Sequence, residues 1–200
     1  MELLLIRHAL PLKVEKKDGS PADPELSEIG MDQARKLSRW MASEKLDAIY
    51  SSPLNRARRT AEVLAEQKGI DITLEPGVME FDSRSSAYVP MEELKAQNYN
   101  AWLELVSGGF EKLFDLDQFR KTVLGSLDKI IRSNSGKRVA VVCHGGIINL
   151  WAAHVLGIDK FLFFAPEYTS INRFLSSGKG MNSVASLNET GHLRNHPAME

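Results

Sequence analysis

Short apolar runs separated by polar stretches form the main pattern along this chain, and they have the length of β-strands. The runs at residues 2–6 and 138–143 are almost unbroken, which is typical of strands buried on both faces. The predicted strands span residues 2–6, 46–50, 70–74 and 138–143. Residues 170–175 and 183–187 are predicted to form edge strands.

Longer segments between these runs carry apolar residues at helical spacing. Ser27 is suited to cap the first of these helices, and Pro53 is suited to a first helical turn. The predicted helices span residues 27–43, 53–68, 116–133 and 146–156. This alternation predicts an α/β fold, a three-layer α/β/α sandwich with a mostly parallel central sheet, in a single domain over residues 1–200.

The pattern weakens between residues 83 and 115, where Tyr88, Tyr99 and Trp102 stand among polar residues. A segment of this kind is expected to be a helical insertion that packs on the edge of the sheet.

Composition narrows the class of protein. The chain has 200 residues, of which 43% are hydrophobic, and a net charge of -1. Near-zero charge argues against a general nucleic-acid or membrane-surface partner, and no stretch approaches the ~18 apolar residues of a spanning helix. The first strand begins without a signal-peptide pattern, so a cytoplasmic location is expected. The one cysteine, Cys143, excludes an intramolecular disulfide.

Charged and nucleophilic side chains follow several of the predicted strands. Arg7 and His8 come at the end of the first strand, His144 directly follows residues 138–143, and Arg56 lies shortly after the second strand. Ligands of open α/β sheets bind at the carboxyl ends of the strands, so these side chains are expected to share a pocket. Guanidinium groups bind phosphoryl oxygens in bidentate fashion, and neutral imidazole can attack phosphorus. The pattern therefore indicates phosphoryl transfer through histidine.

Other groups in these segments have ordinary explanations. Arg58 and Arg59 are expected to form a solvated helix face. Cys143 could serve the other well-known phosphatase mechanism, in which an arginine clamps the phosphate of a thiolate enzyme. The position that would carry this arginine holds Asn149, so Cys143 is interpreted as a small buried strand residue.

The Arg7-His8 pair, Arg56, Glu80 and His144 together resemble the histidine phosphatase superfamily, also called the phosphoglycerate mutase-like family. The similarity continues through residues 26–34, 51–61, 144–146 and 187–193. It implies a catalytic set of His8 as phosphorylated nucleophile, Glu80 as general acid, and His144. It also implies phosphate binding by Arg7, Arg56, His144 and a backbone N–H near Gly145.

Two positions depart from the family pattern. Ala9 stands where the family usually has glycine, a small change if the local φ is negative. The segment after Glu80 lacks the family's Gly-Trp-Glu-Gly-like continuation and carries Asp82. Asp82 is therefore a rival to Glu80 for the role of acid.

The resemblance implies a histidine acid phosphatase-like phosphomonoesterase, a metal-independent hydrolase without a cofactor that forms a phosphohistidine on a small phosphorylated metabolite. It also implies that residues 83–115 roof the active site. The alternatives are phosphoglycerate mutase-type transfer and a catalytically silent phosphate binder. The natural substrate and the oligomeric state stay open, with a homodimer among the options. Candidate contacts for a second anionic group are Lys13, Lys16, Lys17 and Arg84.

Overall fold

A computed structural model describes residues 1–109 and 114–194, and within them a six-stranded sheet organises the molecule. In spatial order the strands are β4 (Ile72–Leu74), β3 (Ala48–Ser51), β6 (Arg138–Cys143), β1 (Glu2–Arg7), β7 (Ile171–Ser176) and β8 (Asn182–Glu189). The first four are parallel, β7 runs antiparallel to β1, and β8 runs antiparallel to β7. The predicted mostly parallel sheet is confirmed.

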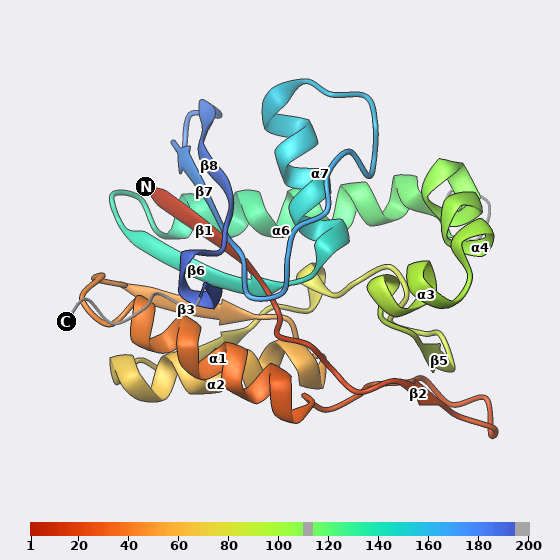
Figure 1. The fold of residues 1–200 in the computed structure, drawn as a ribbon. Coiled ribbons are helices and arrows are strands. Elements are labelled where there is room, and N and C mark those ends of the chain that lie inside the picture. The colour runs from red at the N-terminus through yellow and green to blue at the C-terminus, as the bar shows by residue number, and fades with distance from the viewer. Residues whose placement is uncertain (110–113, 195–200) are drawn as a thin grey trace.

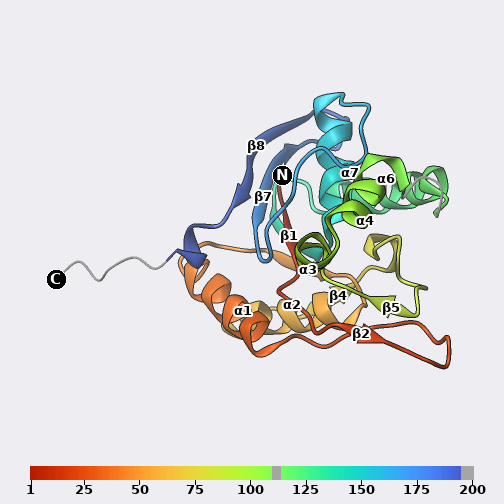
Figure 2. The same ribbon diagram turned by 45° about the vertical axis from the view of Figure 1, so that its right-hand side comes forward.

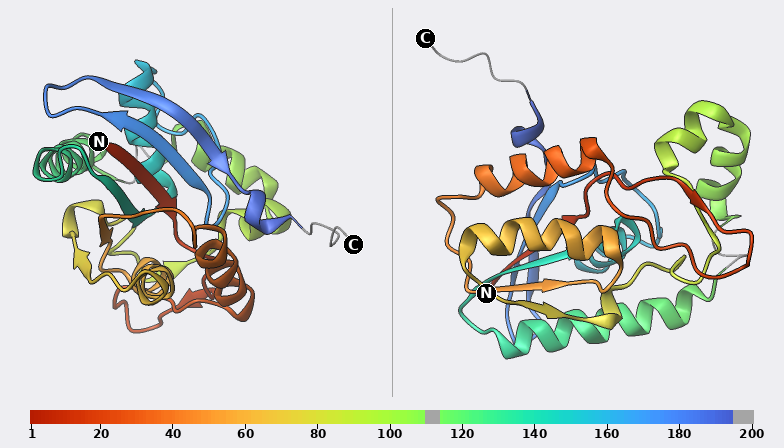
Figure 3. Two further views of the ribbon diagram at one scale, coloured as in Figure 1. Left: turned by 90° about the vertical axis from the view of Figure 1, so that its left-hand side faces the viewer. Right: turned by 90° about the horizontal axis from the view of Figure 1, so that it is seen from below.

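Helices cover both faces of this sheet, as Figures 1 and 3 show. The larger helices are α1 (Glu28–Trp40), α2 (Asn55–Lys68), α6 (Leu116–Ser133) and α7 (Gly145–Leu156). Successive residues of β1 point to opposite faces, so Leu4 and Ile6 pack with Leu37 of α1 and Leu64 of α2. Leu3 and Leu5 pack into the second core, with α6 and α7. The unbroken apolar run of β1 therefore fills two cores, and the expected α/β/α layering is confirmed.

Two of the covering helices differ in character. Amphipathic α6 buries Val123, Leu127, Ile130 and Ile131 on one side. Helix α7 is buried along most of its length, and Figure 1 shows the loop that leads from its end back to β7. Within the described ranges, no helix combines the length and the apolar character needed to cross a bilayer.

One strand assignment was wrong. Residues 170–175 were expected to form an edge strand, whereas β7 lies inside the sheet, hydrogen-bonded to β1 on one side and to β8 on the other. The apolar run of β7 is no more continuous than that of an edge strand, because Asn172 and Arg173 interrupt it. Both polar side chains find partners inside the fold, so the interior position is tolerated.

Several predicted element ends also shift. Helix α1 stops at Trp40 instead of residue 43, and Lys68 of α2 donates hydrogen bonds to the carbonyl groups of Met41, Ala42 and Glu44 that follow. These bonds satisfy carbonyl groups just beyond the end of the helix. Helix α2 begins two residues after Pro53, because Leu54 is still extended. Strand β4 begins at residue 72, two residues later than predicted.

The segment after residue 83 forms short elements at the carboxyl end of the sheet. They are β5 (Ala87–Tyr88), α3 (Met91–Gln97), α4 (Tyr99–Glu104) and the π-helical turn η2 (Leu105–Gly109). β5 pairs with β2 (Val14–Glu15) in a separate two-stranded sheet. Helix α3 reaches the carboxyl end of β1, since its Glu92 lies 3.1 Å from Arg7, and Figure 2 shows α3 near this strand end. Residues 110–113 of the expected insertion lie outside the described part of the chain.

Two short 3₁₀ turns complete the chain trace. The first, η1 (Pro76–Val78), follows β4 and leads to Glu80. The second, η3 (Gly191–Leu193), follows β8 and packs against α1, where His192 lies beside Trp40.

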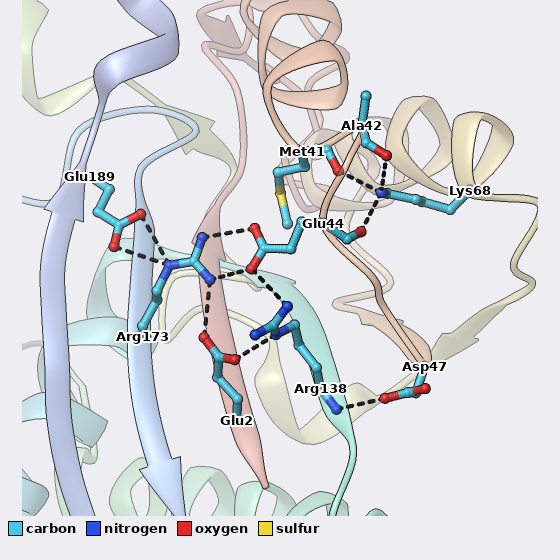
Figure 4. Close-up of polar contacts among 9 residues, drawn as sticks. All are labelled: Glu2, Met41, Ala42, Glu44, Asp47, Lys68, Arg138, Arg173 and Glu189. Atoms are coloured by element: carbon cyan, nitrogen blue, oxygen red, sulfur yellow. Dashed lines mark hydrogen bonds and ion pairs between the residues drawn. The ribbon is translucent and has the colours of Figure 1, made fainter.

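An ion-pair network ties several strands together away from the Arg7-His8 end (Figure 4). Arg173 of β7 contacts Glu2 of β1, Glu44 after α1, and Glu189 at the end of β8. Arg138 of β6 contacts Glu2 and Glu44 as well. The Arg173 side chain is 17% exposed, so its contacts are screened less than those of an ordinary surface pair. The network joins elements that lie more than 100 residues apart in sequence.

Replacing Arg173 by methionine is expected to lower the free energy of unfolding by about 2 kcal/mol at pH 7, between the values for exposed and fully buried pairs. The hydrogen bonds from Arg173 hold the pKa of Glu44 below its ordinary value. A lowered carboxylate pKa stabilises the fold above the unfolded pKa, so the difference should shrink as the pH falls below about 4.5. Urea unfolding of both proteins at pH 7 and at a pH below about 4.5 measures this difference in the free energy of unfolding. The control is Arg132→Met, since Arg132 forms an exposed pair with Asp128 and should cost little. A loss equal to that of the control would contradict the prediction.

Candidate active site

His8 follows the last residue of β1 and lies buried at the carboxyl end of the sheet. Its Nδ1 lies 2.8 Å from the carbonyl oxygen of Ala9. A carbonyl only accepts, so the proton is on Nδ1 and the lone pair is on Nε2. Burial, followed by the charges of Arg56 and Arg7, lowers the pKa of His8 well below its ordinary value. The ring is therefore neutral near pH 7, with one nitrogen able to act as a nucleophile.

Backbone hydrogen bonds hold this strand end in place. The His8 N–H donates to the carbonyl of Cys143, and the Ala9 N–H donates to Thr60 Oγ1. The Thr169 N–H donates to the carbonyl of Arg7, at 3.1 Å. Thr169 has a φ of 57°, a left-handed conformation that costs energy for a β-branched residue. The surrounding fold thus holds a strained residue, Thr169, in backbone contact with Arg7.

His144 comes from the next strand, β6, and caps helix α7. Its ring centre lies 5.1 Å from that of His8, and its Nε2 lies 2.8 Å from Ser52 Oγ. Its Nδ1 is buried and has no hydrogen-bond partner within residues 1–109 and 114–194. Burial and the charge of Arg56 lower the pKa of His144 well below its ordinary value. A buried polar atom without a partner beside His8 marks a place that suits a polar ligand.

Arg7 points its guanidinium at the same region. Its Cζ lies 3.8 Å from the ring centre of Tyr168. Its Nη1 donates to the carbonyl of Pro166 at 2.6 Å and to Glu92 Oε1 at 3.1 Å. Its Nε is buried and, in the described part of the chain, has no partner. One edge of the guanidinium is thus held by the protein, and the Nε side keeps an unused donor.

Arg56 enters from the first turn of α2 and is 1% exposed. Its Cζ lies 4.6 Å from the ring centre of Tyr88, and its Nη2 lies 3.4 Å from Asp82 Oδ1. Its Nε, like that of Arg7, has no partner among the described residues. Two buried cations with unused donors beside a neutral imidazole are suited to bind a phosphoryl group.

Glu80 is buried against the start of α7. The Gly146 N–H donates to its Oε2 at 2.9 Å, and the Phe81 N–H lies 3.3 Å from its Oε1. A β-carbon at position 146 would collide with Glu80 Oε1 and the Phe81 ring, so this approach requires glycine. Burial, and then the charge of Asp82, raise the pKa of Glu80 to about 7. A carboxyl group with this pKa can both give and take a proton near neutral pH.

Asp82 occupies a different position from its rival. Its carboxylate faces Arg56, and burial raises its pKa while Arg56 opposes that rise. Gly145 lies beside Arg7, since a β-carbon there would be 3.9 Å from Arg7 Nε. The structure therefore brings all six predicted site residues to one end of the sheet. Asp82 pairs with Arg56, whereas Glu80 accepts a hydrogen bond from Gly146, two residues after His144.

The other sequence-based interpretations have clear outcomes. Cys143 is fully buried at the end of β6, and burial raises its thiol pKa, which agrees with a structural role. Ala9 is buried, packs with Leu26 and Ala34, and is not among the described residues with positive φ. The methyl group at position 9 is therefore accommodated. Arg58 and Arg59 are about half exposed, as expected of a solvated face.

The candidate contacts for a second anion are less favourable. The Lys13 ammonium is already 3.0 Å from Glu93 of α3. Lys16, Lys17 and Arg84 are exposed. Within the described ranges, none of these three side chains forms a hydrogen bond with Arg7, His8 or Arg56.

Four side chains that contact the site were not predicted from the sequence: Ser52, Tyr88, Glu92 and Tyr168. Ser52 lies in a segment that resembled the family, so its neighbourhood carried a signal. Tyr88, Glu92 and Tyr168 lie in segments without strong periodicity, and nothing local distinguishes them from ordinary surface residues.

Known proteins that resemble this chain include phosphatases and phosphoglycerate mutase-like proteins. Phosphoserine phosphatase 1 of Hydrogenobacter thermophilus is 29% identical, over 96% of this chain and 94% of that protein. A phosphoglycerate mutase-like protein of Arabidopsis thaliana is 28% identical, over 74% of this chain and 67% of its own length. The phosphoserine phosphatase of Entamoeba histolytica, solved with 3-phosphoglyceric acid, has a TM-score of 0.73 and 26% identity, and the match covers 96% of this chain and 99% of that one.

The match to a family model is equally extensive, since it runs from residue 3 to residue 190 and includes every candidate residue described above. Together with the buried histidine pair and its two arginines, this match shows that the chain belongs to the histidine phosphatase superfamily, branch 1.

Proposed function

We propose that this protein is a metal-independent phosphomonoesterase that hydrolyses a small phosphorylated metabolite through a phosphohistidine on His8. The observation that carries the proposal is the neutral, buried His8, whose Nε2 keeps its lone pair and which lies within the field of Arg7 and Arg56, each with an unused Nε donor in the described part of the chain. The family and its phosphoserine phosphatase relatives support a phosphatase hydrolase. Phosphoserine is therefore the first substrate to test.

In the first step, His8 Nε2 attacks phosphorus and the bond from phosphorus to the ester oxygen breaks. Arg7, Arg56 and His144 stabilise the negative charge on the equatorial oxygens. Protonated Glu80 donates its proton to the departing oxygen, which leaves as an alcohol.

In the second step, the Glu80 carboxylate takes a proton from water as the water oxygen attacks phosphorus. The bond from phosphorus to Nε2 breaks, inorganic phosphate leaves, and His8 returns to its neutral form. Glu80 ends protonated, so one turnover restores the starting state. A pKa of about 7 supports both roles of Glu80.

Phosphoglycerate mutase-type transfer is the second candidate, because a mutase-like relative matches most of the chain. In that reaction the phosphohistidine transfers its phosphoryl group to a phosphoglycerate, whereas in hydrolysis the acceptor is water. Conversion of 3-phosphoglycerate to 2-phosphoglycerate in the presence of the bisphosphate would identify it.

The deciding experiment is rapid-quench turnover of p-nitrophenyl phosphate with a chelator present. We expect a burst of p-nitrophenolate equal to the enzyme concentration if the second step is slower, and a phosphoryl group on His8 by mass spectrometry after quenching. Steady release of phosphate should be unaffected by the chelator, and phosphoserine should also be hydrolysed. Loss of turnover with the chelator would refute metal independence. Phosphate binding without turnover would favour the silent binder.

A further inference from the structure

The side chains of the two candidate phosphate-binding arginines, Arg7 and Arg56, are held by the same two kinds of contact. Each guanidinium lies over a tyrosine ring, Arg7 over Tyr168 and Arg56 over Tyr88. Each is also paired with a carboxylate, Arg7 with Glu92 and Arg56 with Asp82. Glu92 lies on α3, within the segment predicted from the sequence to be a helical insertion.

The contacts of Arg7 select one edge of its guanidinium. Nη1 is saturated, since it donates to both the Pro166 carbonyl and Glu92. Nε is buried without a partner in the described ranges, and it lies on the side of Gly145, at the start of α7. A bidentate bond to a phosphoryl group uses two adjacent nitrogens of the fork. The edge that includes Nε is therefore the one left for the phosphoryl group.

Glu92 is itself held in place. Its Oε1 accepts from Arg7, and its Oε2 accepts from the Tyr168 hydroxyl at 3.0 Å. The ring of the same tyrosine packs against the face of the Arg7 guanidinium. Arg7, Glu92 and Tyr168 thus form a closed triangle of contacts, in which each side chain restrains the other two. The Glu92 side chain is 53% exposed, so solvent reaches this triangle from one side.

We propose that Glu92 is a positioning residue that fixes the Arg7 guanidinium, so that its Nε edge faces the phosphoryl group in the transition state. The inference rests on the proposed function, because it assigns Arg7 to the transferring group. It also has an electrostatic consequence. A carboxylate 3.1 Å from Arg7 repels an approaching phosphate, so Glu92 favours orientation at the expense of ground-state affinity.

This role predicts a split between binding and turnover. In Glu92→Ala, Arg7 keeps its charge but loses the partner of Nη1, so kcat should fall about tenfold, the equivalent of one charge-assisted hydrogen bond. KM and the dissociation constant for inorganic phosphate should stay equal or decrease, because the repelling charge is gone. Glu92→Gln keeps an oxygen that can accept from Nη1, so it should retain kcat within about threefold by the same reasoning.

The matched control is Glu93→Gln. Glu93 is the next residue of α3, and its carboxylate faces Lys13 and Gln97 at the surface. Its kinetic constants should match those of the wild-type protein. The substrates are p-nitrophenyl phosphate, phosphoserine and phosphoglycolate, which lacks the ammonium group of phosphoserine. Isothermal titration calorimetry with inorganic phosphate gives the affinity without any turnover.

The outcomes separate the proposal from its competitors. An equal loss of kcat on all three substrates with unweakened phosphate affinity would support positioning. A raised KM and weaker phosphate binding in Glu92→Ala would overturn it and indicate that Glu92 only anchors α3. A loss confined to phosphoserine would also overturn it, because Glu92 would then contact the substrate ammonium. If the wild-type protein binds phosphate but does not turn over, the proposed function fails, and weaker calorimetric binding by Glu92→Ala would refute the inference as well.

Discussion

Replacing His8 by alanine is expected to reduce phosphate release from p-nitrophenyl phosphate by at least ~10⁴-fold, as removal of a covalent nucleophile does in other enzymes. The physical reason is that no other described side chain offers a neutral nitrogen in the same place. His144 lies nearby and its Nδ1 has no partner among the described residues, but Ser52 holds its Nε2 and its ring centre is 5.1 Å from that of His8, so its free nitrogen is not where Nε2 of His8 lies. Steady-state kinetics and the loss of the phosphoenzyme signal measure the effect.

Two controls make this result interpretable. Inorganic phosphate should still bind to His8→Ala, because Arg7 and Arg56 keep their donors. His154→Ala, which changes an exposed histidine of α7, should leave turnover unchanged. Turnover that survives in His8→Ala would reject the phosphohistidine mechanism, whereas loss of both turnover and phosphate binding would indicate a damaged fold.

Replacing Glu80 by glutamine is expected to lower kcat/KM for phosphoserine by about 10²–10³-fold, the usual contribution of a general acid. In the wild-type protein, kcat/KM should fall as the pH rises above about 7, because Glu80 ionises and can no longer donate its proton. The variant should lose this alkaline limb. The measurement is a pH profile of kcat/KM for both proteins.

The leaving group provides an internal test of the same assignment. p-Nitrophenolate is a good leaving group that needs little protonation, so Glu80→Gln should harm phosphoserine more than p-nitrophenyl phosphate. Equal losses on both substrates would argue against the role of acid.

Asp82→Asn distinguishes the two carboxyl groups. The charge of Asp82 contributes to the raised pKa of Glu80, so its removal should move the alkaline limb to lower pH and leave the limb in place. If instead Asp82→Asn abolishes the limb and Glu80→Gln preserves it, Asp82 is the acid.

Folding of Glu80→Gln can be checked through the sign of its stability change. A carboxyl group whose folded pKa is raised stabilises the fold below its unfolded pKa, and this advantage is lost as the pH rises through about 7. At pH 8 the wild-type protein carries a buried charge that the variant lacks. Glu80→Gln should therefore be at least as stable as the wild-type protein at pH 8, and a large loss of stability would mean that its kinetics report misfolding.

Much of the fold was predictable because burial leaves a direct record in local sequence. Strands β1 and β6 are buried on both faces, so they appear as continuous apolar runs. The carboxyl ends of parallel neighbours lie at one edge of a sheet, which is why Arg7, His8 and His144 could be expected to meet. The interior position of β7 was not predictable in this way, since Arg173 and Asn172 give it the composition of an edge.

By itself, the sequence determined the α/β class, the layering, and the group of His8, Arg7, Arg56 and His144, since each follows from a local pattern or from a motif. Only the tertiary structure decided how these groups are tuned. Tyr88, Tyr168 and Glu92, which contact the two arginines, come from segments with no local signal, and the pKa values of His8 and Glu80 depend on burial and on the positions that Arg56 and Asp82 take in the folded protein. The physical reason is range, because periodicity records whether a residue is buried, whereas a contact such as that between Arg7 and Glu92, 85 residues apart, exists only after the chain has folded.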